Sequence, residues 1–324
     1  MSFQAFIQQA NHYGEQRQPF FFLIDFEQHQ PIICPLAQAA EKGLFFAIQG
    51  QQNVHQLAEM PCEPFALRQF PMAKATYQHG FALVQEALQK GNSYLLNLTY
   101  PTDIEMNWNL EQVFHHTTAP YKLYYRDHFV CFSPECFVNI HHNQIYTYPM
   151  KGTIDATLPE AEQRLLASDK ERQEHYTIVD LMRNDLATVA ENVEVTRFRY
   201  VEKIHTQKGA ILQTSSEIRA DLGENWQARI GQILATLLPA GSISGAPKEK
   251  TVQIIQAAEQ QPRGYYTGIF GLFDGESLQS AVAIRFIEQV GEKYVFRSGG
   301  GITMLSDVEE EYQELIQKVY VPVE

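Results

Sequence analysis

The stretch from Tyr266 to Ser298 constrains the fold most, because it has the pattern of an antiparallel meander. Asp274-Gly275 and Gly291-Glu292 are turn signals, and each lies between two apolar, strand-like segments. The three segments are residues 266–273, 278–287 and 294–298. Strands joined by such short turns pair antiparallel. The pattern therefore favours antiparallel sheets, and Gly299-Gly300-Gly301 is expected to interrupt the sheet edge after the third strand.

Helical segments are interspersed among further strands in the rest of the chain. Apolar residues recur at helical spacing, as in Phe81, Val84 and Leu88, and we predict helices over residues 72–90, 109–116, 160–186, 226–237, 247–259 and 307–320. Residues 20–26 suit a buried strand, residues 27–70 give short strand-like pieces, and residues 121–148 suit three strands. Because strands and helices are mixed rather than strictly alternating, the class predicted is α+β.

The composition narrows the classes of function. With 324 residues, of which 44% are hydrophobic, the chain can bury a sizeable core. Its net charge of −13 argues against non-specific binding to nucleic acid or to an anionic membrane. We find neither a basic, apolar leader nor an apolar run of the roughly 20 residues that span a bilayer. We therefore expect a soluble cytoplasmic protein.

The cysteines indicate no metal or redox centre. None of the four forms a CxxC pair or a Cys/His cluster with zinc spacing, which favours buried or free thiols in a reducing compartment. They are Cys34, Cys62, Cys131 and Cys136.

Two predicted helices each carry a pair of carboxylates at i, i+3 spacing. The pairs are Glu171 with Glu174, and Glu311 with Glu314. If the two faces meet, four negative charges converge, and a hard cation, Mg²⁺ first, is needed to offset their repulsion. The alternative is that both pairs are solvated helix faces, since acidic pairs at this spacing are common.

Three further features are candidates for binding an anion. The loop from Gly241 to Lys248 lacks the phosphate-loop pattern, but the helix that follows it either binds an anion at its N-terminus or is an ordinary capped helix start. Gly299 to Gly301 either present backbone N–H groups to a carboxylate or form a flexible turn. Arg285, in an otherwise apolar strand, needs a protein carboxylate or an anionic ligand as its partner.

Lys151 lies in Pro149-Met150-Lys151-Gly152-Thr153, on a turn shaped by the proline and the glycine. Most lysines are solvated surface charges. A lysine at a strand end is a nucleophile or a base when it is partly desolvated or lies beside other cations, which favour the uncharged amine.

Taken together and in order, these stretches resemble the signature series of the chorismate-utilising enzymes. This family includes the anthranilate, isochorismate, salicylate and aminodeoxychorismate synthases. The matching stretches are residues 133–135, 149–153, 174–185, 239–248, 263–268, 283–285, 299–302 and 311–314. The resemblance implies one large α+β domain with mostly antiparallel sheets packed as a sandwich and helices on the outside. It also implies that residues 1–70 form a strand-rich N-terminal part of this domain and that residues 71–324 form the chorismate-binding catalytic region.

Two positions are diagnostic within the family. Lys151 in Pro-x-Lys-Gly-Thr resembles aminodeoxychorismate synthase component I, whereas anthranilate synthases typically have alanine there. Leu95 stands where the isochorismate and salicylate branch has a lysine that activates water. The resemblance thus implies conversion of chorismate and ammonia to 4-amino-4-deoxychorismate, on the route to p-aminobenzoate and folate. Anthranilate synthase component I, or another chorismate-aminating enzyme, and a non-catalytic scaffold that binds an amidotransferase remain alternatives.

The resemblance also assigns roles to residues. Lys151 is the covalent nucleophile and Glu135 the general acid, while Glu171, Glu174, Glu311 and Glu314 hold Mg²⁺. Substrate-binding roles fall to Ser242, Tyr266, Arg285, Gly299, Gly300, Gly301 and Lys318. No Gly-x-Cys-x-Gly glutaminase motif surrounds any of the cysteines. The resemblance therefore implies that a separate glutamine amidotransferase subunit supplies the ammonia.

Overall fold

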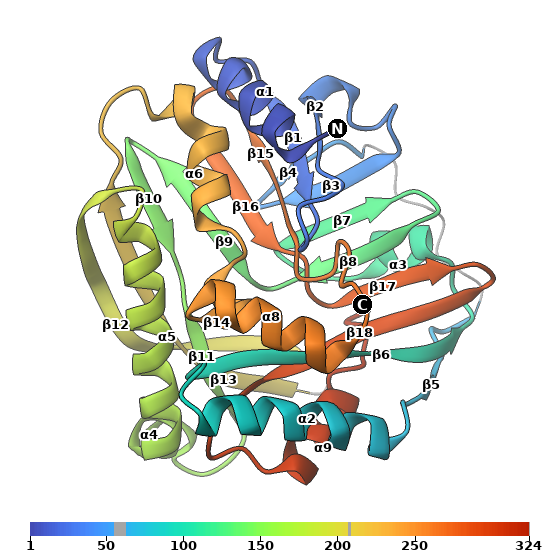
Figure 1. Cartoon of the computed structure of the whole chain (residues 1–324). Helices are drawn as coiled ribbons and strands as arrows, with labels where there is room; N and C mark the ends of the chain where they lie inside the picture. Colours follow the sequence, from blue (N-terminus) through green and yellow to red (C-terminus); the bar gives the residue numbers. More distant parts are fainter. Residues whose placement is uncertain (55–62, 207–208, 324) are drawn as a thin grey trace.

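Two antiparallel sheets pack face to face, and helices cover their outer faces (Figure 1). The computed structural model describes residues 1–54, 63–206 and 209–323. Over these residues each sheet has nine strands. The first has the order β11-β13-β10-β9-β16-β15-β1-β2, with β12 beside β13, and the second has the order β14-β6-β18-β17-β8-β7-β3-β4, with β5 beside β6. The predicted class and sandwich arrangement are confirmed.

The bounds of the elements follow the chain from end to end. The helices are α1 (Phe3–Glu15), α2 (Lys74–Gln89), α3 (Leu110–His116), α4 (Ala161–Ala167), α5 (Asp169–Ala187), α6 (Ile230–Leu237), α7 (Gly241–Ser244), α8 (Lys248–Glu259) and α9 (Val308–Gln317). Short 3-10 turns lie at Leu36–Gln38 and Trp226–Arg229. The first-sheet strands are β1 (Phe20–Ile24), β2 (Ile32–Pro35), β9 (Cys136–His141), β10 (Gln144–Thr147), β11 (Met150–Asp155), β12 (Glu191–Thr206), β13 (Gly209–Asp221), β15 (Ile269–Phe273) and β16 (Leu278–Val282). The second-sheet strands are β3 (Leu44–Ile48), β4 (Gln51–Gln52), β5 (Leu67–Phe70), β6 (Leu95–Met106), β7 (Tyr121–Tyr125), β8 (Phe129–Ser133), β14 (Gly245–Ala246), β17 (Phe286–Val290) and β18 (Lys293–Ile302).

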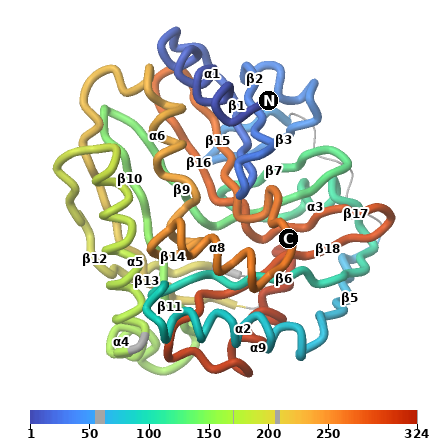
Figure 2. The backbone as a smooth tube through the Cα atoms, viewed as in Figure 1, coloured from blue at the N-terminus to red at the C-terminus, as the bar shows by residue number. Residues whose placement is uncertain are grey.

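The layers explain why β1 is apolar on both faces. Phe21 and Leu23 pack between the sheets, in a core that includes Phe46 of β3 and Leu123 of β7. Phe20, Phe22 and Ile24 instead belong to the core beneath the outer helices, and all five residues of β1 are fully buried. A strand covered on both faces needs a continuous apolar run rather than alternation. β1 pairs with β15, so the two ends of the chain are interleaved within one sheet (Figure 2).

Several predicted boundaries are wrong. The helix expected over residues 160–186 is two helices, because Ser168 is extended and its side chain caps α5 by accepting from the N–H of Glu171. Residues 121–148 form four strands rather than three. The glycine run does not interrupt the sheet, since β18 continues through it. The helix α1, capped by Ser2, was not predicted at all.

The cysteines and the helices bear on two further features of the chain. Cys34, Cys131 and Cys136 are free and buried, and Cys62 lies outside the described residues. In the described part of the chain, no helix is both long enough and apolar enough to cross a membrane.

Candidate functional site

The candidate residues gather where the two sheets meet. Glu135 lies between β8 of the second sheet and β9 of the first. Arg285 lies between β16 of the first sheet and β17 of the second, so the strand predicted over residues 278–287 is in fact a crossover. Arg285 has the left-handed backbone angle φ of 51°, which is uncommon for a residue with a side chain. Lys151 comes from the first sheet and Gly299 to Gly301 come from the second.

Lys151 reaches across the seam to the glycine strand. A Cβ atom on Gly301 would lie 3.4 Å from Nζ of Lys151 and 3.2 Å from Cδ1 of Leu95. Gly301 therefore leaves the space that the ammonium group and the leucine occupy. The Lys151 carbonyl accepts from the hydroxyl of Thr214 on β13, and β11 is irregular between Lys151 and Thr153, where Gly152 has a φ of 83°. The backbone from which the Lys151 side chain extends is therefore held in place by β13.

Glu135 has the environment of a proton donor. The hydroxyl of Ser242 donates to Oε1 of Glu135, and the backbone of Glu135 is fixed by the Ser133 hydroxyl and by the N–H of Val282. Burial raises the pKa of the Glu135 carboxyl above its usual range, although Ser242, Lys151, Arg285 and Lys318 act in the opposite direction. A raised pKa keeps a larger share of the carboxyl protonated near neutral pH.

Two cations, Lys318 and Arg285, lie near the C-terminal end of α9. Nζ of Lys318, just after α9, is 2.6 Å from Oε1 of Glu314 and donates to the carbonyl of Gly299 at 2.8 Å. Burial lowers the pKa of Lys318, and the charges of Arg285 and Lys151 lower it further. The guanidinium of Arg285 lies 5.2 Å from the ring centroid of Tyr320. The two cations thus lie near the acidic residues of the site, and Lys318 is already paired with Glu314.

Tyr266 is the deeper neighbour of Arg285. Its side chain is 4% exposed, and burial raises its pKa to about 12. The phenol is therefore a neutral hydrogen-bond donor at ordinary pH. A donor beside an arginine is suited to an anionic oxygen.

The glycine strand is paired on only part of its length. Gly299, Gly300 and Gly301 pair with Thr99, Leu98 and Asn97 of β6. On the other edge, the register of β17 with β18 ends at Arg297. Backbone groups at Gly299 to Gly301 therefore face an open edge next to Lys318, as an anion site requires.

The acidic pairs lie on two helices. A Cβ atom on Gly300 would be 3.2 Å from Oε2 of Glu311 and 3.3 Å from Oε1 of Glu314, so both carboxylates of α9 converge over this glycine. On α5, Oε2 of Glu171 lies 2.8 Å from the position of a Cβ on Gly152, and Glu174 is partly buried one turn further along.

The pair on α9 fits a divalent cation. Mg²⁺ takes oxygen ligands, commonly one or two carboxylates with water and substrate oxygens, and Glu311 and Glu314 offer such a pair. Within the described residues, however, no three His, Cys, Asp or Glu side chains are close enough together to hold a metal ion. The structure therefore does not gather all four carboxylates, and Lys318 already neutralises Glu314.

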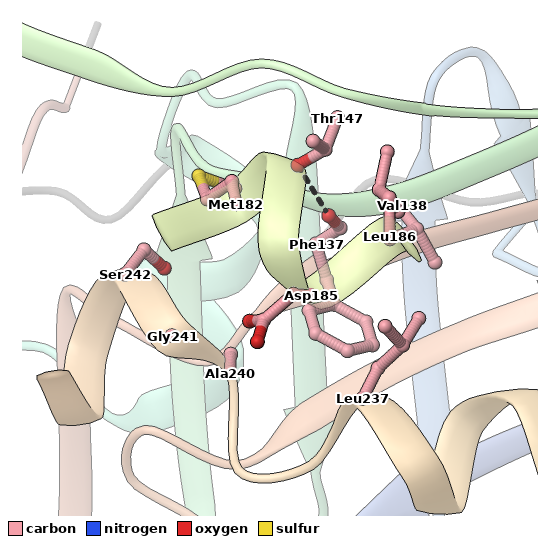
Figure 3. Close-up of a pocket in the computed structure, with 10 residues that line it drawn as sticks. All are labelled: Phe137, Val138, Thr147, Met182, Asp185, Leu186, Leu237, Ala240, Gly241 and Ser242. Carbon is pink, nitrogen blue, oxygen red and sulfur yellow. Dashed lines mark hydrogen bonds between the residues drawn. The ribbon is translucent and has the colours of Figure 1, made fainter. Parts of the chain in front are cut away.

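A small cavity is lined by Ser242 and by residues of β9, α5 and α6 (Figure 3). Asp185 of α5 faces α7 across it, and a Cβ on Gly241 would lie only 2.7 Å from Oδ2 of Asp185. Nζ of Lys248 is 2.9 Å from the same oxygen and donates to the carbonyl of Leu237 at 2.7 Å. Lys248, at the start of α8, is thus linked to α5 by the ion pair and to the end of α6 by the hydrogen bond. α7, which carries Ser242, lies between α6 and α8 in the chain.

Residues that contact the backbone of Lys151 were not predicted from the sequence. His175 is fully buried on α5, its Nε2 is 2.7 Å from the hydroxyl of Ser216, and its ring lies next to the Lys151 backbone. Burial and the Arg199 guanidinium lower the pKa of His175 to about 4, so the ring is neutral at pH 7. Nothing in the spacing of His175 or Thr214 distinguishes them from other core residues.

Comparisons with known proteins identify the family of the chain. The family model described as chorismate binding enzyme matches residues 5–324. The chain therefore belongs to the chorismate binding enzymes. An uncharacterized PabA-like protein of Pasteurella multocida is 86% identical over the full length of both chains. Aminodeoxychorismate synthase component 1 of Escherichia coli is 33% identical over 282 residues, which are 80% of this chain and 60% of that protein.

Solved structures show the same fold. The menaquinone-specific isochorismate synthase MenF of Escherichia coli has a TM-score of 0.72 at 16% identity, over 97% of this chain and 80% of that one. Anthranilate synthase component I of Streptococcus pneumoniae has a TM-score of 0.65 at 24% identity, over 80% and 60% of the two chains. At these identities the likeness concerns the fold alone.

Proposed function

We propose that this chain is an aminodeoxychorismate synthase component I, which converts chorismate and ammonia to 4-amino-4-deoxychorismate and water. The observation that carries the proposal is the position of Lys151, whose Nζ lies against Gly301 beside the apolar Leu95. An amine there can add to a bound ring, whereas Leu95 cannot activate water. The relative of this name in Escherichia coli supports the assignment.

The substrate is a dianion, and the charged groups suit its two carboxylates. We propose that Arg285 and Tyr266 bind the enolpyruvyl carboxylate. Lys318 and the open backbone edge at Gly299 to Gly301 would bind the ring carboxylate. Mg²⁺ held by Glu311 and Glu314 would neutralise charge on that carboxylate when bound, and binding of Glu171 and Glu174 to the same ion would need the two helices to bring their carboxylates together. Ser242 orients Glu135 toward the departing hydroxyl.

The proposed chemistry has two displacements. The uncharged amine of Lys151 adds at C2 and the C4–O bond breaks, with the proton of Glu135 leaving in the water formed. Glu135 regains a proton from the new secondary ammonium. Ammonia then adds at C4, the C2–Nζ bond breaks, and proton transfer through Glu135 returns both groups to their initial states. Ammonia would come from a separate glutamine amidotransferase subunit, and the product would serve the p-aminobenzoate branch of folate biosynthesis.

The test is the product that purified protein makes from chorismate, ammonium chloride and Mg²⁺. We expect a product with the mass of aminodeoxychorismate that an added lyase turns into p-aminobenzoate, and we expect EDTA to stop its formation. Lys151→Ala should reduce the rate by at least 100-fold, while Lys250→Ala, at an exposed position on α8, should leave it unchanged.

Two results would contradict the proposal. Fluorescent anthranilate formed without a lyase would identify an anthranilate synthase instead. Unchanged chorismate in the presence of ammonium, Mg²⁺ and a glutamine amidotransferase, together with no binding of chorismate by calorimetry, would indicate a scaffold.

A further inference from the structure

The amide of Asn97 carries a buried acceptor that the protein does not use. Oδ1 of Asn97 is shielded from solvent and has no hydrogen-bond partner within the described residues. Leaving such an oxygen unpaired is unfavourable, because the loss of its hydrogen bonds to water is not compensated. Buried acceptors are nearly always satisfied, so an exception near a reactive group points to a ligand that supplies the missing donor.

The register places this amide beside Lys151. Asn97 of β6 is directly opposite Gly301 of β18. Side chains of directly opposed residues project from the same face of an antiparallel pair, with Cβ atoms roughly 5 Å apart. The Cβ position of Gly301 is 3.4 Å from Nζ of Lys151, so the amide and the ammonium group lie on the same face of the sheet, with the side chain of Leu95 also next to Gly301.

The backbone of Asn97 is held firmly, so the amide position is defined. Its carbonyl accepts from Nη2 of the buried Arg263 at 2.6 Å. On the same face, Leu95 precedes it and Thr99 follows it, and the N–H and hydroxyl of Thr99 are bound to Glu259. Leu95 is apolar and Thr99 is already bound to Glu259. Of these three residues of β6, Asn97 is therefore the one whose side chain can still accept a hydrogen bond on this face.

We infer that Asn97 binds the incoming ammonia. Oδ1 of Asn97 accepts a hydrogen bond from an N–H of the ammonia, so that the lone pair of the ammonia nitrogen points at the ring carbon. This inference rests on the proposed function and adds a nucleophile subsite to it. Ammonia has three N–H donors and one lone pair, so it can satisfy the amide oxygen and still react. The neutral amide suits this task, because a carboxylate at this position would instead pair with Lys151.

The experiment compares Asn97→Val with Asn97→Thr, two side chains of nearly equal shape of which only the second keeps an oxygen acceptor. Rates are measured against ammonium chloride concentration, at saturating chorismate and fixed pH, with the full chain. We expect Asn97→Val to raise the KM for ammonium by about tenfold and to leave the KM for chorismate within about twofold. Asn97→Thr should stay closer to the wild type in its dependence on ammonium.

A second readout follows the covalent intermediate by intact-protein mass spectrometry. During turnover with ammonium, Asn97→Val should accumulate the Lys151 adduct, whose added mass is chorismate minus water, because the later displacement is the step that is slowed. Asn139→Val is the matched control, since Oδ1 of Asn139 on β9 is also buried and has no hydrogen-bond partner in the part of the chain that the structure describes. It should change neither the ammonium dependence nor the adduct level.

The outcomes separate the two proposals. If the wild type forms neither adduct nor aminated product, the proposed function fails. If the wild type is active and Asn97→Val has an unchanged dependence on ammonium, the subsite is overturned and the function stands. The subsite would also be overturned if Asn97→Val weakened the use of ammonium and of chorismate equally and Asn139→Val did the same. That result would show a structural effect only.

Discussion

Under the proposed function, the surroundings of Glu135 should set the pH range in which it acts as the general acid. Burial raises the pKa of its carboxyl, and the hydrogen bond from Ser242 opposes this by stabilising the carboxylate. A general acid works only while it is protonated. Activity that depends on Glu135 should therefore fall as the pH rises through its raised pKa, and the position of this fall reports the balance of the two effects.

Removing the hydroxyl of Ser242 should move that fall. Ser242→Ala deletes a contact that lowers the pKa of Glu135, so we expect the alkaline limb of kcat/KM for chorismate to shift to higher pH. Glu135→Gln should abolish the limb and lower the rate by roughly 10²–10⁴-fold, the usual contribution of a general acid. A limb that stays in place in Ser242→Ala would show that another group controls it.

At the scale of elements, α7 is a single turn held between α5 and α8. Gly241 is closely packed, because a Cβ there would be 2.7 Å from Oδ2 of Asp185 and 3.2 Å from Cγ of Leu181. The carboxylate cannot move freely, since Lys248 holds it in an ion pair. The position of Ser242 therefore depends on a side chain from another helix.

Gly241→Ala should displace α7 and weaken the contact between Ser242 and Glu135. We expect at least a tenfold loss of kcat, with a lower midpoint of thermal unfolding. In an Asp185→Ala background the added methyl group has room, so Gly241→Ala should cost much less there. Additive losses in the double variant would show that the two positions do not meet in solution.

Prediction from sequence succeeded for elements with local signals and failed for those set by distant partners. Helices α2 and α9 follow from apolar spacing and caps, and their bounds differ from the predicted ones by no more than three residues at either end. Helix α1 was missed. The crossover at Arg285 is invisible in an apolar run, because the two halves differ only in which sheet they join. The candidate site residues were named from motifs, whereas Asn97, His175 and Asp185 matter through neighbours that spacing does not reveal.

At the scale of the molecule, Arg263 links several layers. It is 1% exposed, forms an ion pair with Glu259 of α8, and donates to the carbonyls of Asn97 in β6 and Ile243 in α7. Its guanidinium also lies 4.6 Å from the ring centroid of Phe26, just beyond β1. A side chain with so many fixed partners holds the second sheet and the helices α7 and α8 in one arrangement.

Breaking this network should destabilise the whole protein. Arg263→Met leaves Glu259 buried without its partner, which typically costs about 3–5 kcal/mol of unfolding free energy. Arg68→Met is the matched control, because the pair of Arg68 with Glu105 is exposed and contributes little. Urea unfolding of the two variants would decide this, and equal small changes in both would show that the buried network is not important for stability.

The position of Glu135 and Arg285 between the sheets has a consequence for how the site forms during folding. Glu135 and Arg285 each lie in a segment where the chain passes from one sheet to the other, and Lys151 and the glycine strand come from opposite sheets. A newly made chain that has completed only one sheet therefore lacks the groups that the other sheet contributes to the site. Under the proposed function, such a chain would not act on chorismate until both sheets are assembled.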